Sequence, residues 1–359
     1  MPHASSIARP AVAPAGGRWS RLFRDAAQTG GRTPSRLYGV GLVAALAVLA
    51  WRFGIWMPLV GGPVFGILLG MLVRNTVGVS LVFAPGVAFS ARQVLQWSIV
   101  GLGFGLSLQQ VVQTGSSSLM VTGVTLTVAF VSAWWMGRCL GLSGHLKTLI
   151  GVGTAICGGS AIAAVAPIIK PDDHDTALAI STIFLFNVVA VLLFPLLGHM
   201  FGMSDLGFGL WAGTAINDTS SVVAAGYSYS TAAGDYATIV KLTRATMIIP
   251  VCLVLAVWVA WRARNGAGGV SLGRIFPWFI LWFLVASGIQ SMGWVPALLA
   301  APLHTLAQFL IVMALTAIGL SSDLRRMARA GARPLLLGLG VWMAVSLSSL
   351  AMQAITGTW

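Results

Sequence analysis

The chain has 359 residues, of which 57% are hydrophobic and only 8% are charged, and its mean hydropathy is +0.89. Because soluble domains carry about 25% charged residues, this composition excludes a soluble globular protein and indicates a multi-pass membrane protein. The formal net charge of +13 comes from basic residues in short stretches between apolar runs. It does not indicate a basic face on a soluble fold, so nucleic acid is not an expected partner.

Residues 1–36 form a basic segment that cannot bury a core. Its arginines lie among Ala, Ser, Pro and Gly, at Arg9, Arg18, Arg21, Arg24, Arg32 and Arg36. We expect a disordered cytoplasmic tail that contacts the anionic inner leaflet. The next apolar run begins late for a signal peptide, and cleavage after Ala50 is the alternative. Residues 37–359 then form one transmembrane domain.

About eleven apolar runs follow the tail and predict an all-α transmembrane domain. Roughly 20 apolar residues are needed to cross the hydrocarbon core. By this rule the spans are 37–54, 56–73, 91–109, 118–137, 147–169, 177–198, 207–228, 237–261, 275–292, 303–322 and 333–355. The first of these runs is short, and the seventh is the most polar.

Lys and Arg fall mainly in every second loop between these runs. With the tail inside, the even-numbered loops hold Arg74, Arg92, Arg138, Lys147, Arg262, Arg264, Arg274, Arg325, Arg326, Arg329 and Arg333. The odd-numbered loops hold little beyond Arg52 and Lys170. Because short cytoplasmic loops retain positive charge, we expect a bacterial inner-membrane protein with a cytoplasmic N-terminus and a periplasmic C-terminus.

The fifth run contains a polar interruption in its middle. Thr154, Cys157 and Ser160 flank or adjoin the glycine pair Gly158-Gly159. Two adjacent glycines destabilise a helix by about 1 kcal/mol each relative to Ala. Broken helices persist in lipid only where the freed backbone groups face protein or a polar cavity. The pattern therefore predicts the wall of a transport site.

Short strings recur along the chain. G-T-A-I occurs at 153–156 and again at 213–216, and a related string, T-A-I-G-L-S-S, lies at 316–322 in the tenth run. The fifth and tenth runs are predicted to cross in opposite directions, as an inverted five-helix repeat requires. The first run is then an extra helix, with repeats at about 56–200 and 205–357. Gly158-Gly159 and Gly319 are the expected corresponding breaks in crossing helices.

Ionisable residues inside spans cost about 2.5 to 3.5 kcal/mol each, so they indicate function. Asp218 lies mid-span in the seventh run, and its polar neighbours are Asn217, Thr219, Ser220 and Ser221. It is either a substrate-facing or proton-coupled acid, or a buried carboxylate that caps a helix or pairs with a cation. Lys241 and Arg244 lie one turn apart and share a helix face. Lys241 can instead reach the membrane interface, whereas Arg244 is the expected partner of Asp218 or of an anionic substrate.

These groups suit a small anion. Half-helices that stop at Gly158-Gly159 and at Gly319 would direct positive N-terminal ends at the protein centre. Arg244 can bind a sulfate or sulfonate in a fork. Neutral hydroxyl donors follow at Thr154, Ser160, Ser321 and Ser322. The same hydroxyls would also suit Na+, or simply allow close helix packing.

Four segments together resemble one family of bacterial membrane proteins. They read GVGTAICGGSAIAAVAP at 151–167, GTAINDTSSVVAAG at 213–226, KLTR at 241–244 and ALTAIGLSS at 314–322. Over nearly the whole chain after the basic tail, the sequence is similar to the YeiH-type family, whose label names sulfate export. The resemblance implies a secondary transporter with crossed broken helices like those of bile-acid symporters and cation/proton antiporters.

The predicted function is secondary transport of a small anion such as sulfate, a sulfonate or another organic acid, coupled to H+ or Na+. A channel of the same architecture is the alternative, because broken helices and hydroxyl-lined paths serve channels too. No P-loop occurs, the histidines form no i, i+4 pair, and the cysteines lack metal-ligand spacing. We therefore expect no enzyme, metal site or cofactor. The expected partners are lipid, the anion and the coupling ion. Homodimers are common among such folds, but no residue of this sequence specifies one.

A reporter fused after Trp359 should lie in the periplasm, and one inserted at 325–333 should lie in the cytoplasm. Alkaline phosphatase activity and green fluorescence measure the two locations. If both sites report the same side, the count of about eleven spans and the five-helix repeat are wrong.

Overall fold

The computed structural model describes residues 36–57, 60–263, 277–325 and 331–359. Within these ranges all regular secondary structure is helical. The predicted tail lies outside the described residues, apart from Arg36, which begins the first helix. The predicted loop residues Arg264, Arg274, Arg326 and Arg329 also lie outside them.

The described helices follow one another in this order along the chain. They are α2 Arg36–Trp56, α3 Gly61–Thr76, α4 Ala84–Phe89, the π-helix η1 Ser90–Val94, α5 Leu95–Gly103, α6 Leu108–Cys139, α7 Gly144–Ala155, α8 Gly159–Ile169, α9 Asp173–Met200, α10 Asp205–Ala215, α11 Thr219–Tyr229, α12 Thr231–Thr246, α13 Ile248–Ala263, α15 Trp278–Ser291, α16 Ala297–Ser321 and α18 Ala332–Thr356.

Among the described residues, six helical stretches are long and apolar enough to cross a membrane. They are Arg36–Trp56, Leu108–Cys139, Asp173–Met200, Thr231–Val259, Ala301–Ser321 and Ala332–Thr356. A helix rises 1.5 Å per residue, so each can traverse a hydrocarbon core about 30 Å thick. This confirms an all-helical, multi-pass membrane protein. The count of about eleven spans stays a prediction.

The predicted fifth run is a pair of short helices that turns back on itself. Ser143, the N-cap of α7, donates through its hydroxyl to Oδ2 of Asp175 on α9 at 2.5 Å. Further along, Gly153 of α7 lies against Ile183 of α9, so α7 runs parallel to α9. The returning helix α8 ends at Ile169, just before α9 begins at Asp173. We call α7–α8 the first hairpin.

The predicted seventh run is a second pair of this kind. Ser230, directly after α11, donates through its hydroxyl to Oδ1 of Asp205, the first residue of α10, at 2.7 Å. Trp211 of α10 stacks on Phe194 of α9 with ring centroids 4.0 Å apart. Because the start of α10 and the end of α11 lie together, α11 retraces α10. We call α10–α11 the second hairpin.

The two hairpins begin at opposite ends of the fold, because α9 alone joins the end of the first to the start of the second. We call the end with Ser143 and Asp175 the basic end. It collects most of the basic residues that the structure describes outside the centre: Arg36, Arg74, Arg92, Arg138, Lys147, Lys170, Arg325 and Arg333. We call the other the opposite end, where Ser204 donates to the carbonyl of Trp359 at 2.9 Å.

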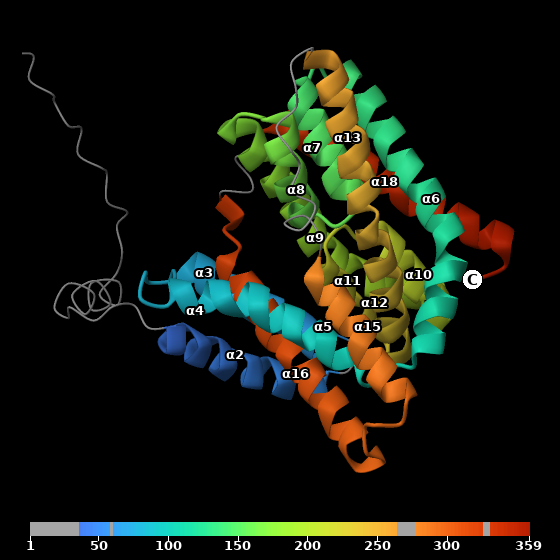
Figure 1. Ribbon diagram of the computed structural model, residues 1–359. Helices are drawn as coiled ribbons and strands as arrows, with labels where there is room; N and C mark the ends of the chain where they lie inside the picture. The colour runs from blue at the N-terminus through green and yellow to red at the C-terminus, as the bar shows by residue number, and fades with distance from the viewer. Residues whose placement is uncertain (1–35, 58–59, 264–276, 326–330) are drawn as a thin grey trace, which may run out of the picture.

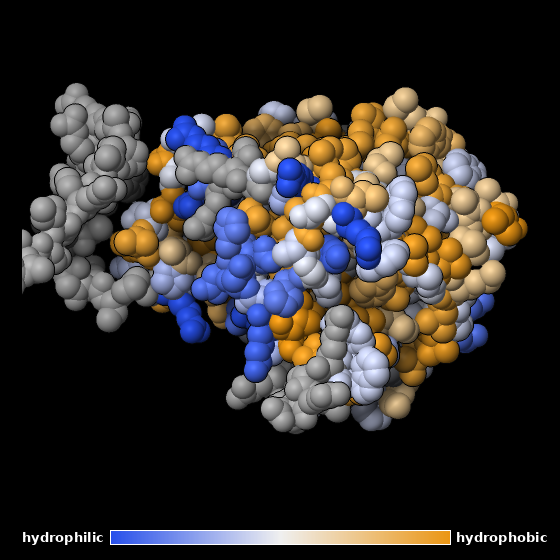
Figure 2. All heavy atoms as spheres, turned by 90° about the horizontal axis from the view of Figure 1, so that it is seen from above, coloured by the Kyte–Doolittle hydropathy of each residue, from blue (hydrophilic) through white to orange (hydrophobic). Residues whose placement is uncertain are grey.

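The helices form two bundles (Figure 1). One bundle consists of the two hairpins with α6, α9, α12, α13 and α18. Beside it lies a panel that consists of α2 to α5, α15 and α16. Buried apolar residues of α3, α16, α9 and α11 join the two. Figure 2 views the molecule from the top of Figure 1 and shows hydrophilic side chains gathered on part of this face beside broad apolar surfaces.

The predicted break at Gly319 is wrong. Helix α16 continues through this residue to Ser321. A Cβ at Gly319 would lie 2.3 Å from the carbonyl oxygen of Ile67 and 3.0 Å from Cα of Gly70 on α3. Gly319 therefore allows two helix backbones to approach closely, which is a common use of small residues in membranes.

The hairpin geometry places Lys170 at the same membrane face as Arg138, whereas an eleven-span chain places them at opposite faces. We expect Lys170→Cys and Arg138→Cys, in a background with Cys139 replaced by Ser, to react with an impermeant maleimide from the same side. Phe201→Cys should react from the other side. Labelling of intact against permeabilised cells measures this, and Lys170→Cys reacting from the side opposite to Arg138→Cys would contradict the hairpin.

Candidate functional site

The turn of the first hairpin is built on a glycine. Residues 156–158 connect α7 to α8, and Gly158 has φ +66° and ψ −130°. Positive φ strains any residue with a Cβ. A Cβ at Gly158 would also lie 3.3 Å from Cβ of Asp218 in the second hairpin. The structure thus has a break at Gly158, and it is the point where the two hairpin turns touch.

The turn of the second hairpin is capped by its own acid. Asp218 is the N-cap of α11, and its carboxylate accepts from the backbone N–H of Ser220 at 3.0 Å and from the Ser220 hydroxyl. The backbone N–H of Asp218 donates to Oδ1 of Asn187 on α9 at 3.2 Å. Of the alternatives for Asp218, the helix cap is therefore the contact that the structure shows.

Lys241 of α12 connects the two turns. Its Nζ donates to the carbonyl oxygens of Ile156 and Ile216, both at 2.8 Å. These two isoleucines end the two G-T-A-I strings. Lys241 is fully buried, so it does not reach the membrane interface.

Arg244 makes the same kind of contact one turn further along α12. Its Nε donates to the carbonyl oxygen of Ala155 at 2.6 Å, and its Nη2 to that of Thr154 at 2.9 Å. Its Nη1 donates to the carbonyl oxygen of Thr214 in the second string. The guanidinium is fully buried, and each of its three nitrogens has a carbonyl partner.

These contacts satisfy the broken ends of α7 and α10. The last four carbonyls of a helix lack an intrahelical partner and form the negative end of its dipole. Because α7 and α10 end inside the bundle, water does not reach their last carbonyls. Lys241 and Arg244 supply the hydrogen-bond donors that water supplies at exposed helix ends. A hydrogen bond to a charged group contributes about 1.5 to 3 kcal/mol. The carbonyls in turn offset part of the cost of burying two cations.

The predicted pairing of Asp218 with Arg244 is wrong. In the described part of the chain no ion pair joins them, because Ser220 holds the carboxylate and three carbonyls hold the guanidinium. The helix breaks place these carbonyls within reach of Arg244, and a fork of five donors suits them. Because the guanidinium is also fully buried, it is closed to a substrate.

The first hairpin turn also presents an open helix N-terminus. The N-cap of α8 is Gly158, which provides no side-chain cap. Nearby, Oγ1 of Thr154 and Oδ1 of Asn217 are buried without a hydrogen-bond partner, and the free thiol of Cys157 is buried. Buried polar atoms without partners are rare in folded proteins. The hairpin turns therefore concentrate unsatisfied polar groups.

One face of α8 leads away from these turns. Ser160 is exposed and Asp218 is partly exposed, although their neighbours Gly158 and Asn217 are buried. Ala163 and Pro167 are also exposed, and with Ser160 they share one face of α8 at helical spacing. Because α8 ends at the basic end, this face forms an accessible stripe from the turns to that end.

The predicted site residues therefore separate into two groups. The structure brings together Thr154, Cys157, Gly158, Gly159, Ser160, Asn217, Asp218, Thr219, Ser220 and Arg244. Ser321 and Ser322 lie instead at the end of α16, where each hydroxyl donates to the carbonyl four residues earlier at 2.9 and 2.8 Å. No described contact joins these serines or Gly319 to the hairpin turns.

Two residues gain roles that the sequence did not assign. Asn187 holds the backbone of the second turn, and its only signal was a lone amide within an apolar run. From the sequence, Lys241 either shares the inward face of Arg244 or reaches the membrane interface. Its contacts with both hairpin turns show that it faces inward. The shared G-T-A-I strings were the available signal for this pairing, because they mark the two carbonyls that Lys241 binds.

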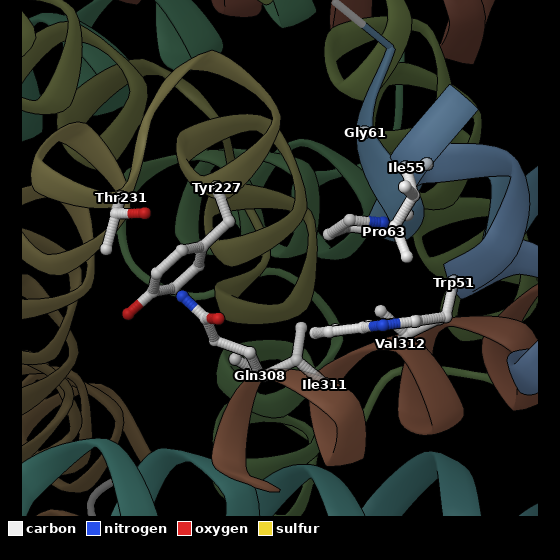
Figure 3. A pocket seen from close by; sticks show the side chains of 11 residues that line it. Trp51, Ile55, Gly61, Pro63, Tyr227, Thr231, Gln308, Ile311 and Val312 are labelled. Atoms are coloured by element: carbon white, nitrogen blue, oxygen red, sulfur yellow. The ribbon is translucent and has the colours of Figure 1, made fainter. Parts of the chain in front are cut away.

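A second polar cluster lies at the opposite end, between the panel and the second hairpin. Tyr227 of α11 donates to Oδ1 of Asp235 on α12, and Nε2 of His304 on α16 lies 3.5 Å from the same oxygen. Tyr227 also lines a pocket of about 250 Å³ with Trp51 and Gln308 (Figure 3). Across the residues that the structure describes, no group of three or more His, Cys or Asp is placed to hold a metal ion.

The sequence matches known membrane proteins over most of its length. The family model described as Conserved hypothetical protein 698 matches residues 37–338. A UPF0324 membrane protein of Fusobacterium nucleatum is 42% identical over 343 residues, which cover 90% of this chain and 99% of the relative. A UPF0324 membrane protein of Streptococcus agalactiae is 42% identical over 333 residues, which cover 90% of this chain and 98% of the relative. One of Streptococcus pneumoniae is 43% identical over 329 residues, which cover 89% of this chain and 97% of the relative.

The chain belongs to the UPF0324 family. The YeiH-type family is the same family, so the resemblance inferred from the sequence motifs is confirmed. The range matched by the family model contains both hairpins and α12, and therefore every residue of the hairpin turns.

In this UPF0324 protein, Arg244→Gln should lower the free energy of unfolding by about 2 to 5 kcal/mol, because it leaves buried carbonyls unpaired. Arg52→Gln is the matched control, since Arg52 is exposed at the opposite end. Thermal unfolding in detergent, followed by tryptophan fluorescence, measures both variants. Equal melting points for the two would show that Arg244 does not support the half-helix ends.

Proposed function

We propose that this UPF0324 protein is a secondary transporter that moves a small anion across the bacterial inner membrane. The supporting observation is that two opposed hairpins stop inside the bundle and meet at their turns. Irregular backbone at membrane depth persists only within protein or beside a cavity. Discontinuous helices that meet near the midplane are a frequent substrate site in secondary transporters.

The charge of the hairpin turns favours an anion. The described turns hold two basic side chains, Lys241 and Arg244, but only one acid, Asp218. Because the two cations neutralise the negative ends of α7 and α10, the open N-terminus of α8 adds a further positive contribution. Ser160 is exposed beside it as a neutral donor. We infer a substrate such as sulfate, a sulfonate or another small organic acid.

Asp218 is the proposed coupling residue. Its carboxylate is the acid at the described hairpin turns and is partly exposed. A negative charge there repels a bound anion, and binding H+ or Na+ relieves that repulsion. The cation and the anion would then favour each other's binding at adjacent positions, as coupled transport requires.

The hairpins also support an inverted repeat that differs from the five-helix frame. The first hairpin with α9 covers 144–200, and the second hairpin with α12 and α13 covers 205–263. A hairpin returns to its own side and the following helix crosses once, so each unit has one net crossing. Adjacent copies of such a unit must have opposite orientations. The two G-T-A-I strings occupy the same position in each, at the end of its first half-helix.

The same topology supports a cytoplasmic basic end. If each hairpin enters and leaves at the same membrane face, Lys170 lies at the basic end with the other basic residues. The link between α9 and α10, residues 201–204, has no charged residue and then lies at the opposite end. Both changes strengthen the positive-inside asymmetry. We therefore retain a cytoplasmic N-terminus and a periplasmic C-terminus.

Transport is tested with purified protein in liposomes against sulfate, sulfite, sulfonates and carboxylates. A carrier should show saturable uptake and counterflow of an unchanged solute. Linear flux with large unitary currents would favour a channel, and absence of flux for every anion tested would contradict anion transport.

Asp218→Asn should tighten anion binding several-fold and abolish accumulation driven by H+ or Na+. Asn still caps a helix but carries no negative charge. Asp205→Asn is the matched control, because Asp205 lies at the start of α10 away from the turns. Thermal-shift titrations measure binding and ion-gradient uptake measures coupling. Wild-type coupling in Asp218→Asn would exclude this role for the acid.

A further inference from the structure

A groove opens at the basic end between α6, α7, α8 and α13. Its volume is about 940 Å³, and its apolar lining includes Phe130 of α6 and Leu255 of α13. Ligand pockets usually measure about 300 to 1,000 Å³, so the groove is large enough for a bulky ligand. It does not include any residue of the hairpin turns.

Aromatic and basic side chains flank this groove. Trp134 and Trp258 line it and are 57% and 48% exposed, respectively. Tryptophan is enriched at the level of lipid headgroups. Within one turn of each other on α7, His145 and Lys147 also line it, and in the described part of the chain neither forms an ion pair with an acid.

The residues that line the groove include a basic side chain, Lys147, and no acid. The acids at the start of α9, Asp172, Asp173 and Asp175, lie outside the lining, and Asp175 is bound by the Ser143 hydroxyl at 2.5 Å. A crevice with an apolar wall on a membrane-spanning bundle is covered by acyl chains. Basic residues at its basic-end rim select a negative headgroup, because each Lys or Arg near the surface attracts anionic lipid.

We propose that this groove binds an anionic diacyl phospholipid. The phosphate lies on Lys147 and His145, and an acyl chain lies along Phe130 and Leu255. A free phosphate would leave the apolar wall without a partner. A phospholipid with no net charge would gain little electrostatic attraction from the basic residues. This proposal does not depend on transport.

The bound lipid would brace the first hairpin. All four helices, α6, α7, α8 and α13, line the groove. Lys147 of α7 already packs tightly on α6, since a Cβ at Gly137 would lie 2.7 Å from Cβ of Lys147. A lipid that fills the groove adds contacts to the hairpin helices and to α6 and α13, so its binding should stabilise the folded protein.

The test uses the full-length protein, stripped of lipid in detergent. Phosphatidylglycerol should raise the melting temperature saturably, and phosphatidylcholine with the same acyl chains should not. His145→Gln with Lys147→Gln should weaken phosphatidylglycerol binding by about fivefold or more, since one Lys near the surface is worth about 1 kcal/mol. Arg325→Gln with Arg333→Gln is the matched control, because these exposed residues lie at the same end outside the groove.

A second variant tests the groove itself. Thr148→Trp keeps both basic residues but fills the space between the helices, and it should also weaken the phosphatidylglycerol effect. Native mass spectrometry counts the lipids retained by each variant. An equal loss in the Arg325 and Arg333 control, an equal effect of phosphatidylcholine, wild-type binding by Thr148→Trp, or full competition by inorganic phosphate would each overturn the proposal.

Discussion

The fold depends on how a helix can end inside a membrane protein. α7 and α10 stop among buried residues, where water cannot bind their last carbonyls, and Lys241 and Arg244 bind them instead. A neutral donor would satisfy one carbonyl but leave the negative end of the helix dipole uncompensated. Two cations on adjacent turns of α12 satisfy both half-helices at once and hold the two hairpin turns together.

This use of the cations determines what remains for a ligand. Because the guanidinium of Arg244 is fully buried and holds carbonyl oxygens, its charge acts on the turns through the local field and not through a direct fork. The groups left over are the N-terminus of α8, the partly exposed acid Asp218 and two buried polar atoms without partners, on Thr154 and Asn217. The first broken helix thus has a C-terminal end at α7 held by basic side chains and an N-terminal end at α8 without a side-chain cap.

The two bundles use different packing. The panel joins α3 to α16 by small residues that bring backbones together at Gly70 and Gly319. The hairpin bundle instead relies on polar contacts at its centre and on aromatic stacking of Phe194 with Trp211 farther out. Between the bundles, apolar residues of α9 and α11 meet α3 and α16, and the Tyr227, Asp235 and His304 cluster lies at the opposite end.

The sequence by itself determined the membrane class, the helical content, the family and the position of the first break. Composition is sufficient for the first two, and Gly158 in an apolar run is a strong local signal, because a buried helix seldom contains adjacent glycines. The repeated G-T-A-I strings also marked both half-helix ends. That each interrupted run turns back on itself within the bundle was visible only in the tertiary structure, since a straight and a returning run bury the same apolar residues over the same length. The partners of Arg244 and the packing role of Gly319 were decided there too, because they depend on backbone atoms of helices that are distant in sequence.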